Sequence, residues 1–216
     1  MSFINNALKK IKLFFQGVKK SYSFNFLNEM ETAFPNSVNK STAALRYLKK
    51  IQKDKNYSEN PNGIKGGNLY WFKYQDPLTK ETLPYWDLEP LVIMSSTFDN
   101  SKGQKRVLGL NMHLLPPHIR VLVFNEIYEA HKSSFKKKLT DKEHSFEFLW
   151  RNMYTRLRKY GGSFAIRMYA PSQIKALKKF PLEEWSKAVY IPSRRYVGTN
   201  LVQLEKEWKA HMRRKN

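Results

Sequence analysis

The chain has 216 residues with 39 lysines and arginines against 18 acidic residues, so its formal charge at pH 7 is +21. Apolar residues make up 41% and aromatic residues 14% of the sequence, which excludes a disordered chain and suits one compact domain with flanking segments. Such a charge attracts nucleic acid, anionic membranes or acidic proteins, and the absence of cysteine excludes disulfides, thiolate metal sites and a cysteine nucleophile.

The first predicted element is a basic amphipathic helix in residues 1–20. Apolar residues recur there at steps of three and four, and five lysines carry all the formal side-chain charge. Because lysines interrupt the apolar residues, we expect neither a signal peptide nor a membrane span. The helix could dock on the core, contact nucleic acid or lie on a membrane surface.

The next elements predict an α+β fold. A helix is expected over Lys40–Asp54, and the turn-rich segment Tyr57–Gly63 indicates a linker or domain boundary. Aromatic and apolar runs predict strands, and helical spacing returns after Pro116-Pro117. The predicted strands are Leu69–Tyr74, Pro90–Met94 and Val107–Met112, and further helices are predicted over residues 119–130, 150–160 and 201–214.

We therefore expect a small antiparallel sheet core with flanking basic helices and extended termini. Three regions are predicted. Residues 1–62 form a basic N-terminal helical arm, residues 63–130 an aromatic sheet core with its following helix, and residues 131–216 a basic helical region with a C-terminal tail.

Positive charge is concentrated in the two flanks. Residues 1–68 carry a net +8 (twelve bases, four acids), residues 69–124 a net +1 (six and five) and residues 125–216 a net +12 (twenty-one and nine). Basic clusters of the last segment alternate with aromatic residues, a mixture that binds phosphates and stacks on bases. We predict a DNA-binding surface formed by Lys136, Lys137, Lys138, Arg151, Arg156, Arg158, Lys159, Lys175, Lys178, Lys179, Arg194 and Arg195.

No motif predicts catalysis, a metal site, a cofactor or a small-molecule ligand. The histidines lack the three- or four-residue spacing of paired helical zinc ligands, and no Gly-Lys-Ser/Thr phosphate loop is present. His113 ends an apolar strand and is expected to be a core histidine bonded to a backbone carbonyl. Asp76, Asp87 and Glu89 could bind magnesium in a nuclease, but turn and capping roles are expected for the two aspartates.

The aromatic segment and the strands after it resemble a family from tailed bacteriophages. The matching elements are Tyr70-Trp-Phe-Lys-Tyr-Gln-Asp-Pro-Leu-Thr-Lys80, Leu83-Pro-Tyr-Trp-Asp87, Pro90-Leu-Val92 and Gly109-Leu-Asn-Met-His-Leu-Leu-Pro-Pro117. They are similar to the aromatic strand, the Asp-Pro-x-Thr-Lys turn and the later elements of the DNA end protector proteins of T-even-like phages. The resemblance covers about residues 68–130 and extends weakly to Trp185–Ser193, while Leu114 stands where the family has tyrosine.

The resemblance implies a virion protein that binds double-stranded DNA without sequence preference and protects genome ends from host exonuclease. It implies phage portal, neck or other virion proteins as partners, and a place in the virion after assembly in the host cytoplasm. No membrane partner and no enzyme activity are expected. The motif residues Trp86, Asp87, Asn111, His113 and Pro116 are interpreted as fold-forming, because they lie in the near-neutral centre of the chain.

Two alternatives remain open at the level of sequence. A structural component of the phage head, neck or baseplate would use the same basic surface to dock on acidic neighbours, without a role specific to DNA. A nuclease of genome processing would require the carboxylates near the aromatic strands to converge on a metal ion.

Overall fold

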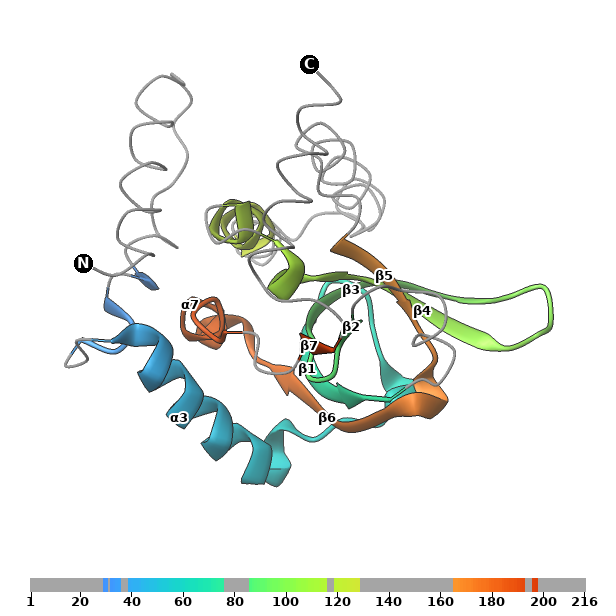
Figure 1. Cartoon of the computed structure of the whole chain (residues 1–216), viewed down its shortest axis with the longest axis horizontal. Helices are drawn as coiled ribbons and strands as arrows, with labels where there is room; N and C mark the ends of the chain where they lie inside the picture. The colour runs from blue at the N-terminus through green and yellow to red at the C-terminus, as the bar shows by residue number, and fades with distance from the viewer. Residues whose placement is uncertain are drawn as a thin grey trace, which may run out of the picture.

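The protein is an α+β structure built on one antiparallel sheet, as predicted. The computed structural model describes residues 29–30, 32–35, 39–75, 86–115, 119–128, 165–192 and 196–197. Its helices gather on one side of the sheet, and a long hairpin projects from the opposite side (Figure 1). Within these ranges, no helix combines the length and the hydropathy needed to span a membrane.

Five strands form the main sheet in the order β5-β4-β3-β1-β6, and every neighbouring pair is antiparallel. The strands are β1 (Leu69–Tyr74), β3 (Leu91–Asp99), β4 (Lys105–Asn111), β5 (Ile166–Tyr169) and β6 (Ile174–Phe180). A second, two-stranded sheet pairs β2 (Trp86–Asp87) with β7 (Tyr196–Val197). β1, β3 and β4 lie where the aromatic and apolar runs predict strands.

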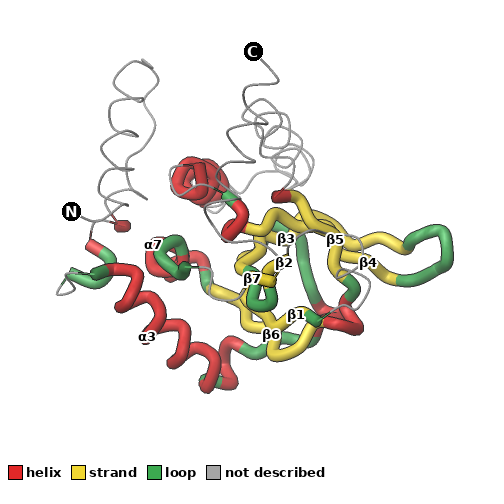
Figure 2. The backbone as a smooth tube through the Cα atoms, in the orientation of Figure 1, coloured by secondary structure: helices red, strands yellow, loops and turns green. Residues whose placement is uncertain are grey.

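The sheet curls on itself, because its two edge strands are consecutive in the chain. Only Ala170 and the 3-10 turn Pro171–Gln173 separate β5 from β6, although the two strands lie at opposite edges. The Ala170 backbone N–H donates a hydrogen bond to the Tyr74 hydroxyl at 3.1 Å, which ties this connection to the end of β1. The curvature of the sheet is visible in Figure 2.

The curled sheet has an aromatic inner cluster. Tyr169 packs edge-to-face on Phe72 and on Tyr74, with ring centroids 5.1 Å apart in both pairs. Burial raises the pKa of the Tyr169 hydroxyl well above its usual value, and the charge of Asp87 adds to the shift. The inner cluster consists of Ile64, Tyr70, Phe72, Tyr74, Val92, Met94, Val107, Tyr169, Ile174 and Leu177.

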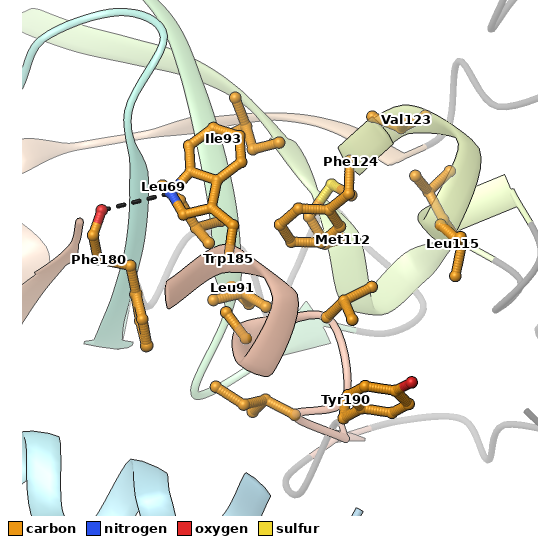
Figure 3. Packing of buried hydrophobic residues seen from close by; sticks show 14 of the residues in the cluster. Leu69, Leu91, Ile93, Met112, Leu115, Val123, Phe124, Phe180, Trp185 and Tyr190 are labelled. Atoms are coloured by element: carbon orange, nitrogen blue, oxygen red, sulfur yellow. Dashed lines mark hydrogen bonds between the residues drawn. The ribbon is translucent and has the colours of Figure 1, made fainter. Parts of the chain in front are cut away.

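The alternate residues of the same strands form an outer cluster with the helices. Leu69 and Trp71 of β1 and Ile93 of β3 face this side, since successive side chains of a strand point to opposite faces. Residues 119–128 are helical, within the helix predicted over 119–130. Their Phe124 packs edge-to-face on Trp185, with ring centroids 5.7 Å apart (Figure 3). The outer cluster is therefore the larger of the two described cores, and it joins the sheet to α3, to α7 and to the helical residues 119–128.

Helix α3 (Lys40–Lys53) begins and ends at polar caps and buries one stripe. The Asn39 side chain accepts a hydrogen bond from the Thr42 N–H at 3.2 Å, which satisfies a free N–H of the first turn. Ala44, Leu48 and Ile51 recur at steps of three and four and are buried in the outer cluster. The lysines of the last turn complement the helix dipole.

A half-buried carboxylate connects α3 to the short helix α7 (Trp185–Ala188). Glu184 precedes α7 and accepts hydrogen bonds from the hydroxyls of Tyr47 and Tyr57, the latter at 3.0 Å. Burial raises the pKa of both tyrosines, and the hydrogen bond to the carboxylate adds to the shift. Both hydroxyls therefore remain protonated donors at neutral pH.

The sheet core extends beyond the predicted region 63–130. β5 and β6 lie in the segment for which the sequence predicts basic helices, and β6 pairs with β1 over its whole length. The segment Tyr57–Gly63 also packs on β6, because the Glu59 N–H donates to the Leu177 carbonyl at 3.2 Å. This turn-rich segment thus continues the packing between α3 and the sheet instead of separating two domains.

Candidate nucleic-acid interface

A β-bulge in β6 decides which way its lysines point. Lys178 pairs with Trp71 and Lys175 pairs with Lys73, so that two residues of β6 lie opposite Phe72 alone. One of the two, Ala176, has a positive φ of 52°. Because of this extra residue, Lys175 and Lys178 share the outer face although they are three apart in sequence, while Lys179 points to the inner side.

Lys175 and its neighbour form an exposed pair of cations. Lys73 lies directly opposite Lys175 in the register, and both side chains are exposed. Like charges in this position repel one another, so binding an anion between them relieves a cost that the free protein carries. This pair is a suitable contact for a phosphate.

Lys178 has a different environment. Its side chain is buried, and its ammonium group donates to the Asp54 carbonyl at 2.8 Å and to the Ser58 hydroxyl at 2.9 Å. These bonds hold the turn after α3 against β6, which is a structural role. The other predicted DNA-binding residues, Lys136, Lys137, Lys138, Arg151, Arg156, Arg158, Lys159, Arg194 and Arg195, lie outside the described residues.

Three motif residues of the resemblance meet in a buried polar cluster. The Asp87 carboxylate contacts His113 Nδ1 at 2.6 Å and accepts a long hydrogen bond from the Asn111 amide at 3.4 Å. Its other oxygen accepts from the Glu89 N–H at 3.0 Å, the turn role expected for Asp87. Asn111 in turn accepts from the His113 N–H at 3.0 Å. The cluster joins β2 to the end of β4.

This cluster corrects one expectation about His113. The histidine is buried as predicted, but it bonds a carboxylate 26 positions away in sequence and not a backbone carbonyl. The buried Nε2 atom has no hydrogen-bond partner in the part of the chain that the structure describes. Among the described residues, no group of three or more histidine or acidic side chains is placed to hold a metal ion. Asp76, Pro116 and the Trp86 side chain lie outside what the structure describes.

The hairpin between β3 and β4 presents an exposed surface that the sequence analysis did not single out. In register, Phe98 lies opposite Arg106 and Leu108 lies opposite Met168 of β5. All four are on the outer face, because Leu110 and Ile166, which belong with the outer cluster, continue the same alternation. Phe98 and Met168 are the large hydrophobic side chains that are exposed among the described residues, at 41% and 55%.

The loop at the tip of this hairpin is held by a network around Asn100. Its side-chain oxygen accepts from the N–H groups of Lys102 at 3.0 Å and Gln104 at 2.9 Å. The Gln104 side chain then accepts from the Arg106 guanidinium at 2.8 Å. Gly103 has a φ of 69°, which a residue with a side chain rarely adopts. The hairpin arm, residues 96–108, therefore has a preorganised loop, and the Arg106 guanidinium is held at its base.

A family model supplies the observation that decides the identity. The model described as the Phage T4 terminal DNA protecting protein matches residues 15–209, which is most of the chain. The chain belongs to this family. No curated protein and no solved structure matches the chain.

Membership in the terminal DNA protecting family confirms the resemblance carried by the aromatic segment. The match also extends far beyond residues 68–130 and includes most of both basic flanks. Within the described part of the chain, the family motif supplies the buried Asp87–His113 contact and the exposed Lys73, and further exposed cations lie on and after α3, on β6 at Lys175 and in the hairpin arm.

Proposed function

We propose that this protein binds the ends of double-stranded phage DNA and shields them from host exonuclease, without reading the base sequence. The observation that carries the proposal is the family match over residues 15–209. The formal charge of +21 supports it, because phosphate contacts supply most of the affinity of sequence-independent DNA binding.

Shielding requires occupancy of the end and no chemical step. For the contacts, we propose the predicted basic residues together with Lys73, and we leave out Lys178, whose ammonium is used inside the protein. We further infer that the protein is carried in the virion beside the packaged genome, where portal or neck proteins would be its neighbours. Neither catalysis nor a cofactor forms part of this proposal.

The test compares a linear duplex with a closed circle of the same sequence. At matched protein concentration and moderate salt, the protein should slow digestion of the linear DNA by a processive exonuclease and leave the circle open to an endonuclease. Equal protection of both substrates would indicate general coating, since phosphate contacts are alike along the duplex. Protection of neither would favour a structural component of the head, neck or baseplate.

Salt dependence tests the phosphate contacts themselves. If about six phosphates are contacted, affinity should fall roughly a thousandfold between 50 and 200 mM salt. Replacing Arg156, Arg158, Arg194 and Arg195 together should weaken binding equally on unrelated sequences and reduce the salt slope. A flat salt response would contradict the proposal, and a changed sequence preference would point to base readout.

A further inference from the structure

Phosphate contacts alone cannot distinguish a DNA end from the rest of a duplex, because the same phosphates run along its whole length. Besides its terminal 5′ and 3′ groups, an end exposes the flat face of its terminal base pair, which is covered by stacking everywhere else in the duplex. A protein that recognises this face needs an exposed apolar or aromatic group for stacking, with cations beside it for the last phosphates.

The β3–β4 arm carries such a surface. Phe98 and Leu108 are diagonal neighbours across the two strands, and Met168 follows opposite Leu108, so the three side chains form a continuous apolar stripe. By alternation along the strands, the stripe lies on the outer face of β3, β4 and β5. The hairpin itself projects away from the covering helices (Figures 1 and 2). These three side chains belong to neither the inner nor the outer cluster of the described core.

Two cations lie next to this stripe. Arg106 lies beside Phe98 in the register, and Lys102 lies at the tip of the loop. Lys105 lies on the opposite face by the same alternation, and its ammonium donates to the Asn62 carbonyl at 3.4 Å. The acidic side chain of residues 96–108 is Asp99, which lies opposite Lys105. The arm therefore carries a net positive charge next to an exposed ring.

We propose that the outer face of the β3–β4 arm is the part of the protein that recognises a DNA end. In this inference, which rests on the proposed function, Phe98 stacks on the terminal base pair with Leu108 and Met168 beside it. Arg106 and Lys102 contact the phosphates nearest the end. The fixed loop around Asn100 favours this contact, because little conformational freedom is lost when a preorganised surface binds.

Charge favours DNA over a protein as the occupant of this face. A protein partner that covered the apolar stripe would also have to supply acidic groups for Arg106 and Lys102. The terminal base pair of a duplex offers an apolar face and a phosphate border in one ligand, which matches the arrangement of the arm.

The experiment uses the full-length protein and two short duplexes, one blunt-ended and one closed at both ends by hairpin loops that cover the terminal base pairs. Fluorescence anisotropy measures binding at moderate salt for Phe98→Ala, Phe98→Trp and Thr97→Ala. Thr97 is the matched control, because it is exposed on the same strand but on the opposite face, paired with Val107 of the inner cluster. Thermal unfolding verifies that each variant is folded.

We expect Phe98→Ala to weaken binding to the blunt duplex about tenfold and to leave binding to the closed duplex unchanged, because one stacking contact is lost. Phe98→Trp should retain the preference for the open end, and Thr97→Ala should match the unmodified protein. Equal weakening on both duplexes by Phe98→Ala would overturn the inference. So would unchanged binding to both, which would assign the face to a protein partner.

Failure of the proposed function would look different. If the unmodified protein binds open and closed duplexes equally, end recognition itself is wrong, whatever Phe98 does. If it prefers the open duplex and Phe98→Ala keeps that preference, the proposed function stands and the site lies elsewhere.

Discussion

The two ends of the β3–β4 hairpin lie in different environments although the same two strands form both. At one end, Leu91, Ile93 and Leu110 are buried in the outer cluster beneath the helices. At the other end, residues 97–99 and 101–105 are exposed, and apart from Phe98 and Gly103 they carry polar or charged side chains. One hairpin thus provides both core and surface. Substitutions a few residues apart should therefore affect either stability or binding, and seldom both.

The largest effect is expected at the covered end, for Trp185→Ala. Trp185 is fully buried against Phe124, and its indole N–H donates to the Phe180 carbonyl at 3.3 Å. Truncation should lower the free energy of unfolding by about 3–5 kcal/mol. Denaturant unfolding followed by circular dichroism measures this change. A loss below about 1 kcal/mol would mean that the cluster is not the main core.

Gly109→Ala should cost less, about 1–3 kcal/mol, because it overpacks the middle of β4. A Cβ at this position would lie 2.4 Å from Val92 Cγ1 and 3.1 Å from the Ile93 carbonyl oxygen. Gly63→Ala is the matched control, since a Cβ there meets no atom within 4 Å. The same unfolding measurement should separate the two variants; equal stabilities would contradict the packing described for β4.

Alkaline pH should act on the core, because residues 96–106 of the arm contain no tyrosine whereas Tyr169 packs in the inner cluster. The pKa of Tyr169 is raised in the folded protein. As the pH rises above about 10, the usual pKa of tyrosine, the unfolded chain therefore loses this proton before the folded protein does. Stability is then full below pH 10 and falls above it, by up to about 1.4 kcal/mol per pH unit. Tyr169→Phe should flatten this decline in urea unfolding between pH 9 and 11, and an unchanged slope would contradict the assignment.

The smallest effect on stability is expected in the arm. Gly103→Ala places a side chain at a φ of 69° in otherwise open space, so the expected cost is backbone strain of about 1 kcal/mol. Gly103→Asn should cost less, because asparagine tolerates this conformation better. Thermal unfolding checks both variants. A cost near that of Trp185→Ala would show that the arm is part of the core.

The sequence predicted correctly the elements whose apolar residues recur at one regular spacing. The aromatic run of β1 and the apolar stripe of α3 appear where their residues indicate, and the caps at Asn39 and Asp54 fall close to the predicted ends. β6 was missed because the bulge at Ala176 breaks its alternation and places three lysines in a strand with a buried side. The curl of the sheet depends on contacts between distant segments, which no local pattern encodes.

The site was predicted less completely than the fold. Basic clusters indicated nucleic acid correctly as a class of partner, but spacing alone could not show that Lys178 bonds Asp54 and Ser58. The contact between Asp87 and His113 joins two motif elements whose proximity appears only after folding. Phe98 lies outside the predicted strand Pro90–Met94, because β3 continues to Asp99, and its side chain is exposed.

The pairing of β1 with β6 has a consequence for synthesis on the ribosome. Leu69 pairs with Phe180, so β1 cannot pair with β6 until most of the chain has been synthesised. Until then, the far edge of β1 offers unpaired backbone groups and aromatic side chains to other nascent chains. Translation speed between residues 75 and 174, and chaperones that cover this edge, should therefore influence how much protein reaches the folded state.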